Sequence, residues 1–249
     1  ISLDFTSTGL TKATSDVFTV EAATADYLAV TGNSEQEAGV EQTITLTAYD
    51  EFDNVAKGYT GDKDLTFSGA NPSPAPSSNP VVKDKNDAEV DFGSVTTLTF
   101  ANGIVSTGMI LYNDESATVT ATDQTINADK NSLSVDVTHS DAGYMAVTGS
   151  ATQEAGNSQT IILTAYDAYN NKVLDYAGEK TLHFFGANPS PASNEPKVEN
   201  IAFGSDVSIN FSAGESTADM TLFMVENAGI GATDQTTGGI TTPADYQLD

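Results

Sequence analysis

The stretch DYLAVTGNSEQEAGVEQTITLTAYDEFDN, at residues 26–54, recurs with small changes as GYMAVTGSATQEAGNSQTIILTAYDAYNN at residues 143–171. The offset is constant here: Tyr144 follows Tyr27 by 117 residues (144 − 27 = 117) and Asp167 follows Asp50 by the same number (167 − 50 = 117). ATDQT, by contrast, recurs 111 residues later (232 − 121 = 111), which a six-residue deletion in the Pro/Ser-rich loop after the first NPSP explains. Self-similarity at a fixed period indicates repeated structural units, so the chain is predicted to hold two copies of one domain.

The first 24 residues resemble the segment TATDQTINADKNSLSVDVTHSDAG, residues 120–143, which closes the first copy. Both segments occupy the same place relative to DYLAVTG or GYMAVTG. We therefore predict that residues 1–24 are the terminal strand of a preceding repeat, or a strand added to repeat one. Repeat one then covers 25–138 and repeat two 139–249. A start at Ile1, without Met or a leader sequence, is expected of a piece of a longer protein.

Strand patterns dominate both copies. Ile44, Leu46 and Ala48 alternate with threonines, which is typical of a half-buried strand in an antiparallel sheet. In repeat two the same alternation is expected to bury Ile162 and to leave Ile161 on the outer face. About seven such strands in roughly 110 residues favour an immunoglobulin-like sandwich over a barrel. The predicted fold class is all-β, with two tandem Ig-like antiparallel β-sandwiches.

Three motifs connect these copies to a known group: A-x-D-x-x-x-N at residues 48–54, GYTG at 58–61 and TATD at 120–123. With the strands around them, they resemble the bacterial Ig-like, filamin-like repeats that occur in tandem in large surface, S-layer and biofilm-matrix proteins. The resemblance implies a tandem extracellular module and names no ligand. Repeat two departs from it, with DYAGEKTLHFFG in place of GYTGDKDLTFSG.

Composition excludes several classes of partner. Nine basic and 35 acidic residues give a net charge of −26, and such a surface repels nucleic acid and anionic lipid, which need clustered Lys and Arg. No apolar run reaches the length of about 18 residues that a membrane span needs, so no direct membrane insertion is expected. The chain has no Cys, which excludes disulfides and thiolate metal sites.

No catalytic constellation stands out. The two histidines, His139 in the linker and His183 in a predicted strand, are not repeated between the copies. The sequence shows no nucleophile elbow, no phosphate-binding glycine loop and no zinc-type His spacing. The chain is therefore predicted not to be an enzyme and to have no cofactor other than a cation.

Calcium is the sharpest ligand hypothesis, because Ca²⁺ prefers carboxylate, amide and carbonyl oxygens and such groups gather in the loops at the ends of both repeats. Where repeat one meets repeat two, the candidate metal ligands are Asp114, Glu115, Asp141, Asp167, Asn170 and Asp234. A similar set at the start of repeat one comprises Asp50, Asp53 and Asp123. Asp and Asn are also good turn residues that bond their own backbone, and acidic loops can simply be solvated.

These observations predict an extracellular structural module whose partners are neighbouring repeats, with self-assembly through Ca²⁺ bridges between acidic modules. The alternative is an adhesin module that binds one protein or glycan. A glycan site needs aromatic platforms, and the chain has no Trp. Its tyrosines at 112, 144, 166 and 169 are the available substitutes.

Overall fold

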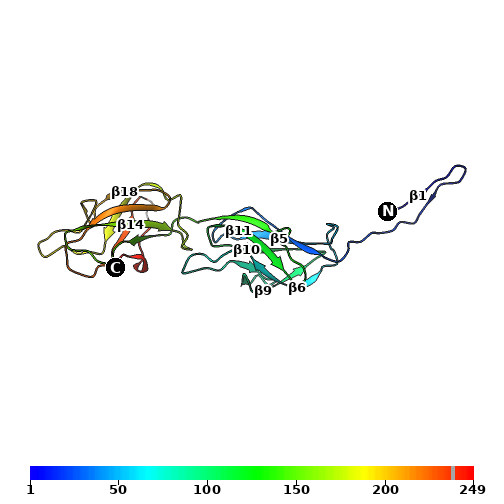
Figure 1. Ribbon diagram of the computed structural model, residues 1–249, viewed down its shortest axis with the longest axis horizontal. Helices are drawn as coiled ribbons and strands as arrows, with labels where there is room; N and C mark the ends of the chain where they lie inside the picture. The colour runs from blue at the N-terminus through cyan, green and yellow to red at the C-terminus, as the bar shows by residue number, and fades with distance from the viewer. Residues whose placement is uncertain (237–238) are drawn as a thin grey trace.

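The computed structural model describes residues 1–236 and 239–249 and shows two β-sandwiches end to end, with a thin N-terminal hairpin extending beyond repeat one (Figure 1). Strands account for nearly all of the regular structure, so the all-β prediction is confirmed. The described helical structure is one short 3-10 turn, Ala244–Tyr246. No helix in residues 1–236 and 239–249 has the length and apolarity to cross a bilayer.

Repeat one consists of two facing five-stranded sheets. The first has the order β3-β5-β10-β7-β8, formed by Tyr27–Thr31, Gln42–Tyr49, Ile104–Ile110, Val81–Lys83 and Glu89–Asp91. The second has the order β4-β12-β11-β6-β9, formed by Glu35–Glu37, Leu133–Thr138, Glu115–Thr122, Gly61–Ser68 and Val95–Phe100. Pairing is antiparallel throughout except between β4 and β12, which run parallel.

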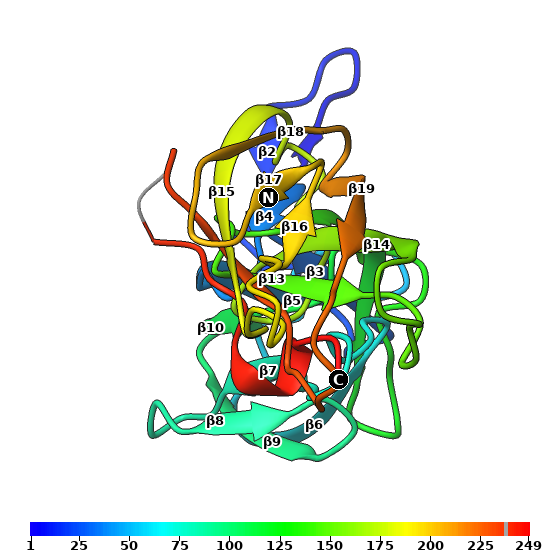
Figure 2. The same cartoon turned by 90° about the vertical axis from the view of Figure 1, so that its left-hand side faces the viewer.

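Repeat two reproduces the first sheet and only part of the second. Its first sheet has the order β13-β14-β19-β16-β17, formed by Tyr144–Thr148, Ser158–Tyr166, Glu215–Thr221, Lys197–Val198 and Ile201–Ala202. Its second sheet has three described strands in the order β18-β15-β20, formed by Val207–Phe211, Gly178–Phe185 and Gly231–Asp234. Figure 2 looks along the long axis with repeat two nearest the viewer.

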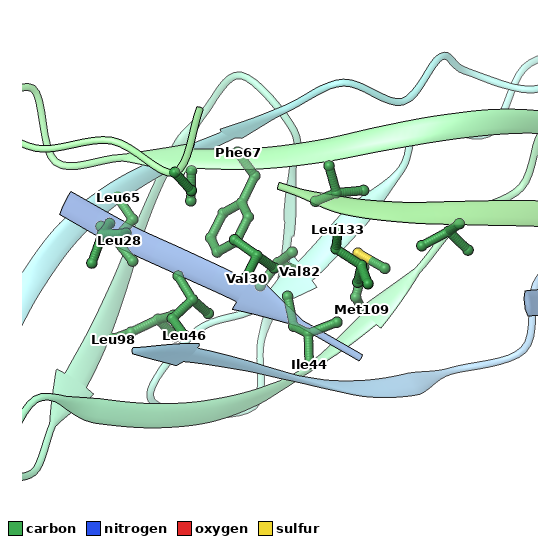
Figure 3. Close-up of a cluster of buried hydrophobic side chains, with 14 of the residues drawn as sticks. Leu28, Val30, Ile44, Leu46, Leu65, Phe67, Val82, Leu98, Met109 and Leu133 are labelled. Carbon is green, nitrogen blue, oxygen red and sulfur yellow. The ribbon is translucent and has the colours of Figure 1, made fainter. Parts of the chain in front are cut away.

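Each sandwich has its own apolar core. In repeat one, alternate residues of β5 point inward, so Ile44, Leu46 and Ala48 are fully buried and pack with Phe67 and Met109 from other strands (Figure 3). Burying one such side chain stabilises the fold by about 1.5–3 kcal/mol. Because each sandwich encloses a separate core, the poles of the sandwiches, where the loops meet the linkers, decide how the repeats connect.

One prediction about the alternation in repeat two is wrong. Ile161 is fully buried, whereas Ile162 is 39% exposed. The repeat register gives the reason, since Ile161 is the equivalent of Ile44 and successive strand residues point to opposite faces. Two adjacent isoleucines hid this register in the sequence.

The N-terminal hairpin pairs β1, Asp4–Phe5, with β2, Ala13–Thr14. Apolar side chains of the hairpin and of the segment that follows it are exposed: Phe5 by 60%, Phe18 by 45% and Val20 by 71%. A solitary two-stranded hairpin is marginally stable in water, so this segment has little to hold it against solvent.

Candidate functional site: the joint between the repeats

The joint is built around a buried carboxylate, that of Asp167, at the N-terminal pole of repeat two. Its Oδ1 accepts hydrogen bonds from the backbone N–H groups of Tyr169 and Asn171, at 2.8 and 2.9 Å. Its Oδ2 accepts from the linker N–H of Ser140 at 3.0 Å and from Asn171 Nδ2 at 2.9 Å. Asp167 is 0% exposed. One side chain thus fixes both the turn that follows β14 and the path of the linker.

Two asparagines of the same turn reach across to repeat one. Asn171 Nδ2 donates to the carbonyl of Tyr112 at 2.8 Å, and Asn171 Oδ1 accepts from the N–H of Asp114 at 3.0 Å. Asn170 Nδ2 donates to the carbonyl of Pro76 at 2.9 Å and lies 3.4 Å from that of Pro74. These bonds join repeat two to two separate loops at the C-terminal pole of repeat one.

An aromatic contact lies between these bonds. The rings of Tyr112 and Tyr169 have centroids 5.0 Å apart, tilted by 58°. The Tyr169 hydroxyl lies against Gly39, where an added Cβ would be 2.0 Å from the Tyr169 oxygen. Gly39 has φ +78°, which L side chains rarely adopt. The absence of a side chain at Gly39 therefore lets the ring seat at the joint.

The N-terminal pole of repeat one repeats the carboxylate arrangement, with Asp50 in the place of Asp167. Asp50 is 0% exposed and accepts from the N–H groups of Phe52, Asn54 and the linker residue Ala23. Burial raises the pKa of the Asp50 carboxyl, but the hydrogen bonds from Asn54, Ala23 and Phe52 outweigh burial and leave the pKa below its ordinary value. Ala23 and Ser140 are separated by the repeat offset (140 − 23 = 117), so the linker is held in the same way twice.

Each repeat has a second carboxylate near its N-terminal pole, and a tyrosine hydroxyl donates a hydrogen bond to it. Tyr59 donates its hydroxyl to Asp123 Oδ2 at 2.6 Å, and Tyr176 donates to Asp234 Oδ2 at 2.6 Å. Burial and the neighbouring carboxylate both raise the pKa of Tyr59 and of Tyr176. A lysine lies 4.5 Å from the centroid of each tyrosine ring. Beside each pair is a shallow hollow, of about 420 Å³ in repeat one and 510 Å³ in repeat two.

The predicted calcium ligands are mostly engaged by protein donors. Asp50, Asp123, Asp167 and Asp234 use their oxygens as described above. The side-chain acceptor oxygens of the others are engaged as follows: Glu115 with the N–H and Nδ2 of Asn71, Asn170 with the hydroxyls of Tyr144 and Tyr246, Asp53 with the hydroxyl of Tyr27, and Asp114 with the N–H of His139. Asp141 is exposed in the linker.

This arrangement does not fit a calcium ion at the joint, because Ca²⁺ needs six to eight converging oxygens. Among residues 1–236 and 239–249, no three His, Asp or Glu side chains are placed to hold one ion. The structure places Asp114, Asp167 and Asn170 at the joint between the repeats. Asp53 lies beside Tyr27 and Glu115 beside Asn71, both within repeat one. Calcium binding by the chain stays a prediction.

The sequence pattern gave no sign that Gly39 and the loop carbonyls of Pro74 and Pro76 lie at the joint, and it considered Tyr169 only as part of a glycan site. The only signal for Gly39 was its place in the shared EAG triplet, residues 37–39 and 154–156. The two histidines lie apart from each other: His139 Nε2 is 3.8 Å from Asp175, and His183 on β15 bonds to Asp206.

No protein family matches the sequence, and no curated protein matches it. Among solved structures, the chain is similar to the Yersinia pseudotuberculosis adhesin InvE, with TM-score 0.34 and 14% identity over 86% of this chain and 58% of that one. It is also similar to a Parabacteroides merdae β-glucuronidase, with TM-score 0.26 and 10% identity over 86% of this chain and 24% of that one. For E. coli alpha-2-macroglobulin the TM-score is 0.25, with 10% identity over 97% of this chain and 16% of that one. The chain spans less than two thirds of each, and likenesses this weak carry no inference about function.

Proposed function

We propose that this chain is a non-catalytic structural segment of a tandem array that works outside the cell, at a surface, in an S-layer or in a biofilm matrix. The observation that carries the proposal is the joint: a fully buried carboxylate, Asp167, ties the linker to repeat two while Asn170 and Asn171 bond repeat two to repeat one. An interface with these directed bonds sets the angle between modules. Because Asp50 holds the preceding linker in the same way, the same device can serve successive modules.

The geometry favours a mechanical role. A joint of this kind converts a string of domains into a rod, and the rod's reach is the number of modules multiplied by their length. The two facing poles at the joint are occupied by contacts that hold the repeats together, and the charged surface keeps neighbouring rods apart. The tyrosine–aspartate pairs, half-buried in repeat one and buried in repeat two, are hydrogen-bonded within the fold and stabilise it.

We also propose that Ca²⁺ lets such acidic rods cohere. A net charge of −26 on 249 residues opposes close approach between copies, and divalent cations relieve that repulsion by bridging exposed carboxylates on two molecules. In this proposal the ions lie between rods rather than in the joint, whose carboxylates are engaged by protein donors.

Small-angle scattering of the chain and two variants tests the joint. Asp167→Ala should give a shorter and more flexible average particle. Asp50→Ala is the matched control, because it removes the equivalent carboxylate from a pole outside this joint and should leave the angle between the repeats unchanged. Identical scattering from both variants and from the parent would remove the support for a rigid joint.

Light scattering in EDTA, Ca²⁺ and Mg²⁺ at matched ionic strength tests the cation part. Assembly with Ca²⁺ alone supports bridging, whereas equal effects of Ca²⁺, Mg²⁺ and added NaCl reduce the role of the ion to screening. Saturable binding to one protein or glycan, unaffected by cations, would instead favour the adhesin alternative.

A further inference from the structure

Each repeat carries a stacked pair of tyrosines on the outer face of its first sheet. Tyr27 pairs with Tyr49 across β3 and β5, and their ring centroids lie 5.3 Å apart with 20° between the planes. In repeat two, Tyr144 and Tyr166 stack in the same way, at 5.4 Å and 23°. All four tyrosines are half-buried. The repeats therefore share one aromatic platform, and they differ in the residue that lies over it.

In repeat two a third tyrosine covers the platform. The ring centroid of Tyr246 lies 4.4 Å from that of Tyr144, with the rings tilted by 45°. The Tyr246 hydroxyl donates to Oδ1 of Asn170 at 3.0 Å, and the Tyr144 hydroxyl donates to the same oxygen at 2.5 Å. A six-membered ring that carries a hydroxyl group thus fills the space between the platform and residue 170.

Repeat one has an asparagine, Asn131, in the place of Tyr246. The equivalence follows from the leucines two residues further on, Leu133 and Leu248, which pair with equivalent strand residues and lie against equivalent glycines. The N–H groups of Asn131 and Tyr246 also bond in the same way, each to the carbonyl three residues earlier. In place of the ring, repeat one has a hollow of about 450 Å³, whose lining includes Tyr27, Ala29, Thr31, Tyr49, Asp53 and Asn131.

The identity of a second residue also distinguishes the two places. Asp53 is the equivalent of Asn170 (170 − 53 = 117), and both have a left-handed backbone, with φ +64° and +67°. Asn170 donates its amide to the carbonyl of Pro76 across the joint, whereas a carboxylate has no N–H group to donate. Asp53 therefore cannot make that interdomain bond, and its Oδ1 accepts from the Tyr27 hydroxyl at 2.8 Å.

The groups around the hollow suit a ring with several hydroxyl groups. Asp53 supplies carboxylate oxygens and Asn131 supplies an amide, while Thr31 and Ser132 supply hydroxyls along the same wall. A few polar groups around an apolar surface are typical of a site that orients a small ligand. A pyranose has hydroxyls around its edge and an apolar C–H face that can pack on a tyrosine ring, whereas a phenol ring has one hydroxyl. The arrangement therefore favours a sugar.

The charges near the hollow select a neutral sugar. Lys130 Nζ lies 5.4 Å from the centroid of the Tyr27 ring and 3.9 Å from Asp26, and its side chain is 74% exposed. An exposed cation–π contact of this kind is weak, so the lysine can leave the ring when a ligand stacks there. The carboxylates of Asp26 and Asp53 and the net charge of −26 repel an anionic ligand.

We propose that this hollow of repeat one binds one neutral pyranose residue of a glycan, with the C–H face of the sugar on Tyr27 and its hydroxyls bonded to Asp53 and Asn131. The site goes beyond the structural role, because it gives the segment a ligand of its own. The hollow lies toward the N-terminal pole of repeat one and the joint lies at the opposite pole, so a sugar can bind without opening the joint.

Saturation-transfer NMR of the full chain with methyl glucoside, methyl galactoside, methyl mannoside and N-acetylglucosamine tests the proposal. The parent should bind at least one of these sugars saturably, and Tyr27→Ala should weaken that binding about tenfold or more, the factor that corresponds to about 1.4 kcal/mol. Asn131→Tyr should weaken it as much, because it introduces the side chain that fills the equivalent space in repeat two. Thr118→Tyr is the matched control: it adds the same side chain at an exposed position of β11, in the other sheet, and should bind like the parent. Equal weakening by both tyrosine variants, or a parent that binds none of the sugars, would overturn the proposal.

Two further probes define the class of ligand. Methyl glucuronide should bind more weakly than methyl glucoside at low ionic strength, where the repulsion between carboxylates is least screened, and tighter binding of the glucuronide would overturn the choice of a neutral sugar. N-acetyltyrosinamide presents one hydroxylated aromatic ring, and its binding in place of the sugars would assign the hollow to a protein side chain and overturn the proposal. The rigid joint would stand in either case, because scattering by Asp167→Ala tests it separately. Sugar binding by a chain whose joint proves flexible would favour the adhesin alternative.

Discussion

The contact between Gly39 and Tyr169 offers the sharpest test of the joint. The equivalent glycine in repeat two, Gly156, has nearly the same backbone angle, φ +84° against +78°, and nothing within 4 Å of an added Cβ. Gly39→Ala and Gly156→Ala should therefore carry the same left-handed backbone cost, about 1–2 kcal/mol. Only Gly39→Ala adds a clash with the Tyr169 ring.

The structure gives the size of the difference. A Cβ at 2.0 Å from the hydroxyl forces the Tyr169 ring out and with it the turn that holds Asn170 and Asn171. The aromatic pair contributes about 1 kcal/mol, and each interdomain hydrogen bond about 1 kcal/mol. Freeing the turn should therefore remove roughly 2–4 kcal/mol of coupling between the repeats. Such a change alters the ratio of closed to open joints by about 30- to 1000-fold.

Pulsed electron–electron double resonance between two spin labels can measure this change. The chain has no native Cys, so labels attach only at introduced cysteines. Labels at Thr43→Cys on β5 and Thr217→Cys on β19 lie on exposed positions of the two repeats. The parent and Gly156→Ala should give one narrow distance distribution, and Gly39→Ala a broad one. In a Tyr169→Ala background the substitution at Gly39 should have no further effect. Equal widths for the two glycine variants would refute the claim that Tyr169 holds the joint.

Three further outcomes follow from the hydrogen-bonded carboxylates. Asp167→Ala leaves the N–H groups of Tyr169, Asn171 and the linker without their acceptor, so repeat two should lose about 3–5 kcal/mol of unfolding free energy in chemical denaturation. Tyr176→Phe removes a buried hydroxyl bond and should cost about 1–3 kcal/mol, a fall of about 4–8 °C per kcal/mol in the melting temperature. Burial raises the pKa of Asp123, but hydrogen bonds from Tyr59 and from backbone N–H groups outweigh burial and leave the pKa below its ordinary value. The stability that the ionised carboxylate gives to the fold is therefore present above about pH 4 and is lost as the pH falls through the lowered pKa. Acid titration of Asp123→Asn should show a flatter loss of stability than the parent, and an unchanged slope would contradict this assignment.

Much of the fold could be predicted because burial follows alternation. The β5 pattern places Ile44, Leu46 and Ala48 inside, and the structure confirms it. The same reasoning failed at Ile161 and Ile162, where two apolar neighbours made both registers acceptable. There the internal repeat was the better guide, since equivalence with Ile44 decides which isoleucine is buried.

The joint could be predicted only in outline. The acidic and amide residues of YDAYNN did come to the interface, but their oxygens face N–H and O–H donors. Sequence patterns show which groups gather at a pole and do not show the hydrogen-bond partners, because these are mostly backbone groups that any residue carries.

The two repeats act as internal controls for each other, and the comparison separates what builds a pole from what selects its partner. The buried carboxylates, Asp50 and Asp167, and the tyrosine–aspartate pairs near them are conserved between the two repeats. They therefore form the pole whatever lies next to it. The outward-facing side chains differ: Tyr169 packs on Tyr112 in the joint, whereas Phe52, its equivalent in repeat one, is 69% exposed. The same scaffold therefore carries a different aromatic side chain at this position in each repeat. Phe52→Ser should therefore leave the joint between the repeats unaltered, and a broadened distance distribution between the labels at Thr43→Cys and Thr217→Cys in that variant would contradict this division of roles.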